Sequence, residues 1–310
     1  MKGKGSGGLA GGLAGALAGG VAGALSGWRL RRDGGEPDAG GVAARLARQS
    51  LHEQHISALF PGGTRFAGKG PVLDCALLLV AFTNRSGSNL LCEYLAQTGQ
   101  VAVAGECLNH DTVAVQQAQH GGTRFTDHIA WLAAQFCPAG ATAARTLAFK
   151  ASLDQMVMLL RWNIPAMFPA VHVLHVRRCD ALAQAVSLSV ASQTGRWTSQ
   201  QAGRSVTPDW RPQEVGMILA GLRLEMQGIG ILADVAGLPL AEVTYEDMIA
   251  DPAGQVGAAL RFCGIDPGGW TPDAPAIDQQ TDADKSALLE RARAAMLQAL
   301  LDHTDRPTAP

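Results

Sequence analysis

The sequence has little lysine, few aromatic residues and almost no net charge. Its 310 residues include five lysines, and aromatic residues make up 5% of the chain. The 25 Lys and Arg residues are nearly balanced by 27 Asp and Glu residues, which gives a formal net charge of -2. This balance argues against nucleic acid as a partner, because nucleic-acid binding usually requires a strongly basic surface. The chain is nevertheless 47% hydrophobic and 17% charged, a composition typical of a folded protein.

The cysteine pattern contains no C-x-x-C pair and no close cluster. The six cysteines are Cys75, Cys92, Cys107, Cys137, Cys179 and Cys263. Zinc ribbons need closely spaced pairs, and disulfide frameworks belong to small secreted domains. The spacing therefore indicates reduced thiols in a cytoplasmic protein, and no cysteine-based metal site is expected.

The N-terminal segment is a repeat of glycine, alanine and leucine. Residues 5–28 carry no charge, and a stretch of about 20 apolar residues is long enough to span a bilayer. However, eight of the nineteen residues from 7 to 25 are glycine, which weakens a helix. We interpret residues 1–38 as a low-complexity tail, with weak membrane contact and export as a signal peptide as the alternatives. Residues 39–310 are expected to form one domain.

Short apolar runs alternate with longer amphipathic stretches through this domain. The predicted strands are Ala76–Phe82, Thr146–Ala151, Val171–Arg177 and residues 240–245. The predicted helices that follow strands are residues 89–97, 153–162, 180–193 and 252–263. Two further long helices (213–236 and 286–303) and an irregular connection or lid (195–211) complete the pattern. Strand–helix units in series predict an α/β fold with a parallel sheet, in which ligands bind at the carboxyl ends of the strands.

A serine- and glycine-rich loop follows the first predicted strand. It reads Arg85, Ser86, Gly87 and Ser88, and Asn89 opens the next helix. Backbone amides, two hydroxyls and the positive end of a helix can together hold an anion. The Walker pattern G-x-x-x-x-G-K-[ST] occurs nowhere in the sequence, which disfavours an ATP or GTP hydrolase. A simple capped turn is the alternative interpretation of this loop.

A second basic segment stands at the end of another predicted strand. Arg177 and Arg178 are followed by Asp180, a natural N-cap, and by Ser187 two turns into the next helix. Two arginines and a serine at the carboxyl end of a strand can hold a second phosphate. A surface arginine pair balanced by Asp180 is the alternative.

Together the two segments resemble PAPS-dependent sulfotransferases, and most closely the bacterial trehalose 2-sulfotransferase-like family. The first segment matches the family pattern T-x-R-S-G-S-x-x-L from Thr83 to Leu91. The second segment matches the pattern R-R-x-D-x-x-x-Q-A-x-S-L from Arg177 to Leu188.

The resemblance continues at SQTGRW (residues 192–197) and YEDM (residues 245–248), and it covers about residues 75–266. It implies an α/β, P-loop-like three-layer fold with a central parallel sheet flanked by helices. It also implies that PAPS (3′-phosphoadenosine 5′-phosphosulfate) is the co-substrate and that no metal takes part.

PAPS carries two separated anionic groups, and the resemblance assigns one segment to each. The 5′-phosphosulfate would lie on the loop, with charge from one arginine and contacts from the residues that follow it: Arg85, Ser86, Gly87, Ser88 and Asn89. The 3′-phosphate would be bound by Arg177, Arg178 and Ser187. Catalysis would depend on positioning and on stabilising charge on the leaving phosphate, as in phosphoryl transfer.

The acceptor hydroxyl needs a base, and Glu106 matches the glutamate proposed for this role in the family. We expect a partly closed cleft to raise the pKa of Glu106 toward the working range. A solvated loop glutamate is the alternative for Glu106, and His110 is the alternative base.

The candidates for acceptor binding are Lys150, Trp197 and His110. Lys150 ends a predicted strand, where it could contact the sulfonate or the acceptor, or pair with Asp154 on the next helix. The ring of Trp197 could stack on adenine or on a sugar, or could anchor a lid.

We therefore expect an enzyme that sulfates a hydroxyl of a carbohydrate or glycolipid. Trehalose as the acceptor and a homodimer as the assembly are suggested by the resemblance alone. The rival hypotheses are a P-loop-like small-molecule kinase, a non-catalytic module that binds PAP (3′-phosphoadenosine 5′-phosphate), and a membrane-anchored sulfotransferase.

Overall fold

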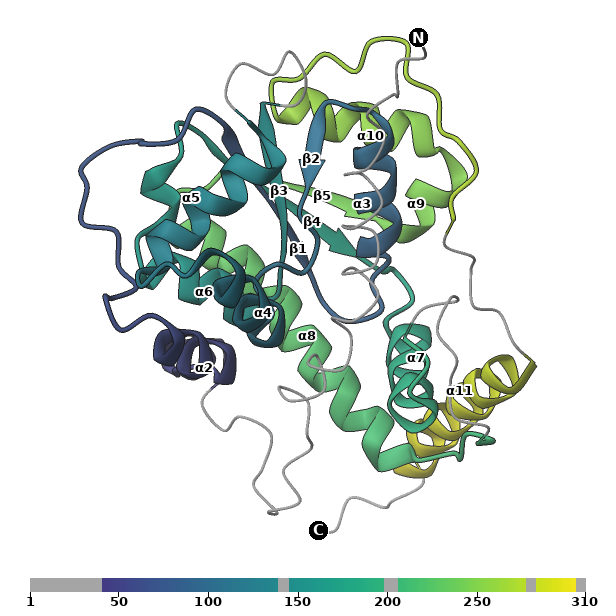
Figure 1. Cartoon of the computed structure of the whole chain (residues 1–310). Coiled ribbons are helices and arrows are strands. Elements are labelled where there is room, and N and C mark those ends of the chain that lie inside the picture. The colour runs from purple at the N-terminus through teal and green to yellow at the C-terminus, as the bar shows by residue number, and fades with distance from the viewer. Residues whose placement is uncertain (1–40, 139–144, 198–205, 277–282, 305–310) are drawn as a thin grey trace, which may run out of the picture.

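The protein is built on a five-stranded parallel sheet with the strand order β2-β3-β1-β4-β5 (Figure 1). The computed structural model describes residues 41–138, 145–197, 206–276 and 283–304, so the predicted tail and residues 198–205 of the predicted lid lie outside the described residues. The strands are β1 (Ala76–Phe82), β2 (Val101–Val103), β3 (Thr146–Ala151), β4 (Val171–Arg177) and β5 (Leu240–Thr244). The predicted α/β class with a central parallel sheet is confirmed.

The central strand β1 explains why the sheet is covered on both faces. Its alternate side chains Leu77 and Leu79 enter one hydrophobic cluster, whereas Leu78 and Val80 enter another. All four side chains are buried. A continuous apolar strand of this kind is stable only where helices cover both sides of the sheet.

Helices cover the two faces of the sheet as separate layers (Figure 1). The elements that pack into the first layer are α2 (Leu51–Leu59), α4 (His110–His120), α5 (Phe125–Phe136), α6 (Leu153–Arg161), the short 3-10 turn η2 (Ile164–Met167) and the C-terminal half of α8 (Pro212–Val235). The second layer comprises α3 (Ser88–Gln97), α9 (Tyr245–Ala250) and α10 (Pro252–Phe262). A third hydrophobic cluster joins α7 (Ala181–Thr194) and α11 (Ala283–Thr304) to the N-terminal half of α8.

The strand predictions agree closely with the structure. β1, β3 and β4 begin and end at the predicted residues, because continuous apolar runs define them. The predicted strand 240–245 ends one residue early, because the Thr244 side chain caps α9 by accepting a hydrogen bond from the Asp247 amide at 3.1 Å. Helices α1, α2, α4 and α5 were not predicted. In α4, for example, only His110 and Val113 are buried, so its apolar pattern is weak.

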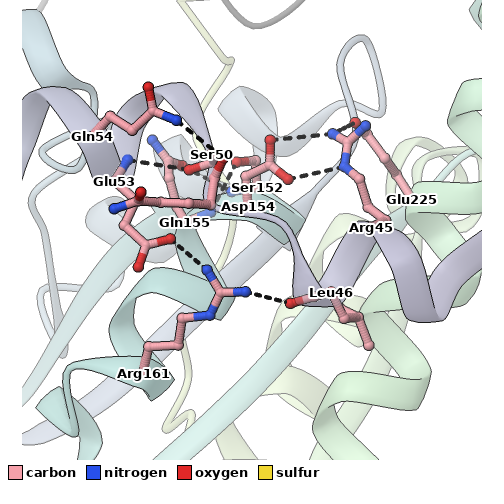
Figure 2. A network of polar contacts seen from close by, with 11 residues as sticks. Arg45, Leu46, Ser50, Glu53, Gln54, Ser152, Asp154, Gln155, Arg161 and Glu225 are labelled. Atoms are coloured by element: carbon pink, nitrogen blue, oxygen red, sulfur yellow. Dashed lines mark hydrogen bonds and ion pairs between the residues drawn. The ribbon is translucent and has the colours of Figure 1, made fainter. Parts of the chain in front are cut away.

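The short N-terminal helix α1 (Gly41–Ala47) is held to the domain by a network of charged groups (Figure 2). Arg45 Nε lies 2.9 Å from Asp154 Oδ1 at the start of α6, and its NH2 lies 2.9 Å from Glu225 Oε1 on α8. By length and composition α8 could cross a membrane, but Glu225 is buried in it and α8 packs against α1, α6 and α7. These contacts are those of a core helix.

A second ion pair in the same network fixes α2 (Figure 2). Arg161 NH1 lies 2.6 Å from Glu53 Oε2, and Arg161 NH2 donates a hydrogen bond of 2.6 Å to the Leu46 carbonyl. The Ser50 side chain caps α2 by accepting from the Glu53 amide at 3.1 Å. The N-terminal helices are thus bound to α6 by polar contacts as well as by apolar packing.

Replacement of Glu225 by Gln should stabilise the protein relative to the wild type at alkaline pH but not at acid pH. Burial raises the pKa of Glu225 to about 7, against the opposing attraction of Arg45. Because this folded-state pKa lies above that of the unfolded chain, ionisation of Glu225 lowers stability as the pH rises through this range. We expect similar melting temperatures at about pH 5, where the wild-type carboxyl is protonated, and a higher melting temperature for Glu225→Gln at about pH 8.

Asp234→Asn, at the exposed end of the same helix, is the control and should show no such change with pH. The account would be contradicted if Glu225→Gln lost more stability at pH 8 than at pH 5, since Arg45 would then outweigh the cost of burial.

Candidate functional site

The candidate site lies at the carboxyl edge of the sheet, where all five parallel strands end. Each strand has a residue with an ionisable side chain at or just beyond this edge: Arg85 after β1, Glu106 after β2, Lys150 near the end of β3, Arg178 after β4 and Tyr245 after β5. The parallel topology therefore brings together residues from distant parts of the chain.

The loop between β1 and α3 leaves hydrogen-bond donors for an anion. No side chain caps α3, and its N-cap is Gly87 in the left-handed conformation with φ 91°. Ser86 is fully buried, yet its hydroxyl has no hydrogen-bond partner among the described residues. The side-chain cap that a simple capped turn would supply is absent from α3, so the first amides of this helix are available to a ligand.

Arg85 connects this loop to α7. Its Nε donates a 3.0 Å hydrogen bond to Ser187 Oγ, and its NH1 donates to the Trp197 carbonyl. Arg85 has φ 66°, an unusual conformation for a residue other than glycine. Burial, and then the nearby charge of Arg178, lower the pKa of Arg85 to about 10. Sequence reasoning placed Arg85 and Ser187 at separate phosphates, and the structure brings them into contact.

Gln184 joins the same two segments from α7. Its Nε2 donates 2.8 Å hydrogen bonds to Thr83 Oγ1 and to the Asn84 carbonyl. Asp180 caps α7, as predicted, by accepting from the Ala183 amide at 2.8 Å. The loop after β1 and the helix after β4 therefore form one polar unit, which the sequence motif alone could not show.

Of the two consecutive arginines, the structure brings only Arg178 to the site. Its guanidinium lies 5.1 Å from the centre of the Tyr245 ring, and its Nε lies 3.8 Å from Glu246 Oε1. Arg177 instead forms an exposed ion pair of 2.7 Å with Glu242 on β5. Asp180, the expected counter-charge of the arginine pair, pairs with Arg293 at 2.9 Å.

Glu106 and Lys150 form an ion pair at the β2–β3 side of the edge. Lys150 Nζ lies 2.7 Å from Glu106 Oε1 and also donates to Asn89 Oδ1 on α3. The turn at Gly105, with φ 62°, directs Glu106 toward β3, and the Gly105 carbonyl accepts from the Lys150 amide at 2.9 Å. Lys150, which also lies 4.5 Å from the centre of the Phe82 ring, thus places beside α3 a lysine, a residue type that the loop sequence lacks.

One expectation about this pair is wrong, and one alternative for Lys150 is excluded. The pKa of Glu106 is lowered, chiefly by Lys150, because that charge outweighs the effect of burial. Lys150 does not pair with Asp154, since Asp154 is bound to Arg45. Glu106 is therefore ionised at neutral pH, and 31% of its side chain is exposed.

His110 belongs to a histidine cluster beside Glu106. Its Nδ1 lies 2.9 Å from Nδ1 of His52 on α2, and its ring lies 4.6 Å from the His55 ring. Burial lowers the pKa of His110, and it lowers that of His52 to about 4, so both rings are neutral at pH 7. His52 also lowers the pKa of Glu106, which places it near the carboxylate. No motif pointed to His52, because α2 was not predicted.

Trp197 contributes a backbone carbonyl to Arg85, and its half-buried ring packs against the cluster of α7, α8 and α11. This packing is what a lid anchor requires. Within the described residues, no group of three His, Cys, Asp or Glu side chains could hold a metal ion.

Comparison with known proteins identifies a family model for part of the chain. Residues 144–295 match the family described as Stf0 sulphotransferase. The matched stretch includes Lys150, Arg178 and Ser187, whereas the loop at residues 83–88 and Glu106 precede it. No curated protein matches the chain.

Among solved structures, the sulfotransferase domain of the Synechococcus PCC 7002 olefin synthase has a TM-score of 0.46 and 18% identity, and the alignment covers 74% of this chain and 90% of that one. A sulfotransferase from Alicyclobacillus acidocaldarius has a TM-score of 0.43 and 15% identity, covering 73% of this chain and 95% of that one. A mouse sulfotransferase complexed with PAP has a TM-score of 0.39 and 11% identity, covering 72% and 66%.

Replacement of Lys150 by Met should destabilise the protein at neutral pH and less so at acid pH. The change leaves a partly buried Glu106 carboxylate without its partner, at a cost of about 1–3 kcal/mol in the free energy of unfolding. In the wild type the pKa of Glu106 is lowered, so the stability that this carboxylate contributes is lost as the pH falls. Without Lys150, burial raises the pKa of Glu106, and its ionisation then lowers the stability as the pH rises. Denaturant unfolding at about pH 4 and about pH 7 measures both effects.

The double variant Lys150→Met/Glu106→Gln is the control, and it should recover much of the stability at neutral pH. An equal loss at both pH values in the single variant would show that Lys150 does not set the charge state of Glu106.

Proposed function

We propose that this protein is a sulfotransferase that transfers a sulfuryl group from PAPS to a hydroxyl of a carbohydrate or glycolipid. One observation carries the proposal: Arg85 and Arg178 follow the adjacent strands β1 and β4, and the Tyr245 ring lies against both Gly87 and Arg178. The charge of Arg178 accordingly contributes to the lowered pKa of Arg85. Two partly desolvated like charges are stabilised by an anion between or beside them. The match of residues 144–295 to the Stf0 sulphotransferase model supports the same function.

The residues of the loop fit the 5′ end of the nucleotide. The buried Ser86 hydroxyl without a partner and the uncapped start of α3 offer donors to a phosphosulfate. Ser88 and Asn89, the first two residues of α3, extend this set. Arg85 provides the charge that stabilises the leaving phosphate.

Arg178 and Ser187 fit the 3′-phosphate. Ser187 is buried at 2% exposure and holds Arg85, so a phosphate at this position would contact both segments. Because Arg177 is paired with Glu242, we assign it a smaller role in binding the 3′-phosphate than the resemblance implies. In this proposal, recognition of the 3′-phosphate distinguishes PAPS from ATP.

On the acceptor side, Glu106 takes the proton of the attacking hydroxyl. Bound PAPS supplies the sulfuryl group: its bond to the 5′-phosphate oxygen breaks as the bond to the acceptor oxygen forms, and PAP leaves. Because Lys150 lowers the pKa of Glu106, the carboxylate is a weak base, which accepts the proton once the attacking oxygen has become acidic.

Lys150 lies between Asn89 and Glu106 and is well placed to stabilise charge on the transferred group. His110, beside the base, and the ring of Trp197 are the candidates for contacts with the acceptor. Neutral imidazoles can exchange hydrogen bonds with sugar hydroxyls, which supports a carbohydrate acceptor.

Replacement of Glu106 by Gln should abolish turnover while PAP affinity stays within about threefold, because the amide keeps the shape of the site but cannot accept the proton. The assay supplies PAPS with a panel of monosaccharides, disaccharides and glycolipids, and detects PAP release and sulfated product by mass spectrometry.

Asp127→Asn, an equivalent change at an exposed position on α5, should keep full activity. Full activity of Glu106→Gln would reject Glu106 as the base. Absence of transfer by the wild type to every acceptor, with no PAPS-dependent release of PAP, would count against the proposed function.

A further inference from the structure

Tyr245, at the start of α9, lies against the loop between β1 and α3 (residues 83–87), which we call the phosphate loop. A Cβ atom added to Gly87 would lie 2.4 Å from Tyr245 Cδ2, so the ring packs directly on the Gly87 backbone. Gly87 is therefore required for two reasons: its φ of 91° suits glycine, and the ring leaves no space for a side chain.

The same ring also contacts the second anion-binding segment. The Arg178 guanidinium carbon lies 5.1 Å from the ring centre, within the range of a cation–π interaction. The next residue, Glu246, accepts a 3.0 Å hydrogen bond from the Cys179 amide and lies 3.8 Å from Arg178 Nε. The first two residues of α9 thus hold the backbone and the side chain that follow β4.

Arg85 and Arg178 repel each other across this region. Tyr245 lies against Gly87, two residues after Arg85, and against Arg178. Each arginine therefore lowers the pKa of its hydroxyl, although the stronger effect of burial raises it. Repulsion alone would separate the two arginines when no anion is bound. The ring of Tyr245, fixed on Gly87 on one side and on Arg178 on the other, opposes that separation.

We propose that Tyr245 is a positioning residue that fixes the spacing between the phosphate loop and Arg178, and so favours a nucleotide phosphorylated at both the 5′ and the 3′ positions. This inference rests on the proposed function. A ligand with two phosphates binds well only if both segments are at the correct distance, whereas a ligand with one phosphate needs only one segment. Loss of the Tyr245 ring should therefore weaken the binding of a ligand with two phosphates more than that of a ligand with one.

Calorimetric titration of the full-length protein with PAP and with AMP tests the inference. We expect the wild type to prefer PAP, and Tyr245→Ala to reduce that preference about tenfold while AMP affinity changes by less than about twofold. Tyr245→Phe should keep the wild-type preference, because the ring rather than the hydroxyl makes both contacts. If the alanine variant does not fold, Tyr245→Leu replaces it and should show a reduced preference in the same direction.

Trp270→Ala is the matched control, because this partly buried aromatic packs on Tyr94 in the same hydrophobic layer. It should lower the melting temperature without changing the ratio of the two affinities. An equal loss of PAP and AMP binding in Tyr245→Ala, or an unchanged ratio, would overturn the inference. If the wild type itself shows no preference for PAP, the proposed function fails first.

A double-mutant cycle with Gly87 gives an independent test. Gly87→Ala should weaken PAP binding strongly in the wild type, since the added methyl meets the ring, and less in the Tyr245→Ala background. The backbone strain at Gly87 is common to both backgrounds and cancels in the cycle. An equal effect in both backgrounds would show that the ring and the loop are not coupled.

Discussion

The structure of the candidate site depends on one unfavourable interaction, the repulsion between Arg85 and Arg178. β1 and β4 are adjacent in the sheet, so the residues that follow them must lie close together. The surrounding contacts hold this arrangement in place: Ser187 accepts from Arg85, and Tyr245 and Glu246 hold the segment around Arg178. An arrangement that costs free energy without a ligand favours a ligand that neutralises it, as the proposed nucleotide would.

In the proposed function, the ion pair of Lys150 and Glu106 separates a donor side of the site from an acceptor side. Lys150 contacts α3, the helix that follows the phosphate loop, and also holds the carboxylate that would face the acceptor. A change in charge on the transferred group would therefore alter the interaction between Lys150 and Glu106, and with it the pKa of Glu106. The nearby rings of His52 and His110 are neutral, so they would contribute hydrogen bonds rather than charge to the acceptor side.

Local sequence signals predicted the parts of this fold that are defined locally. The apolar runs of β1, β3 and β4 gave correct strand boundaries, and Asp180 was correctly predicted as an N-cap. The direction of the pKa shift of Glu106 was predicted wrongly, because it depends on Lys150, 44 residues away in the sequence. Likewise, nothing local indicated that Arg177 would pair with Glu242, or that α2 would place His52 near Glu106.

The most direct test of the account is a calorimetric comparison of PAP, AMP and ATP binding to the full-length wild-type protein at two salt concentrations. The account predicts that PAP binds most tightly and that its advantage over AMP decreases at higher salt, because the two arginines contribute through charge. Tighter binding of ATP, or equal binding of PAP and AMP, would contradict the claim that the edge of the sheet holds two anions at once.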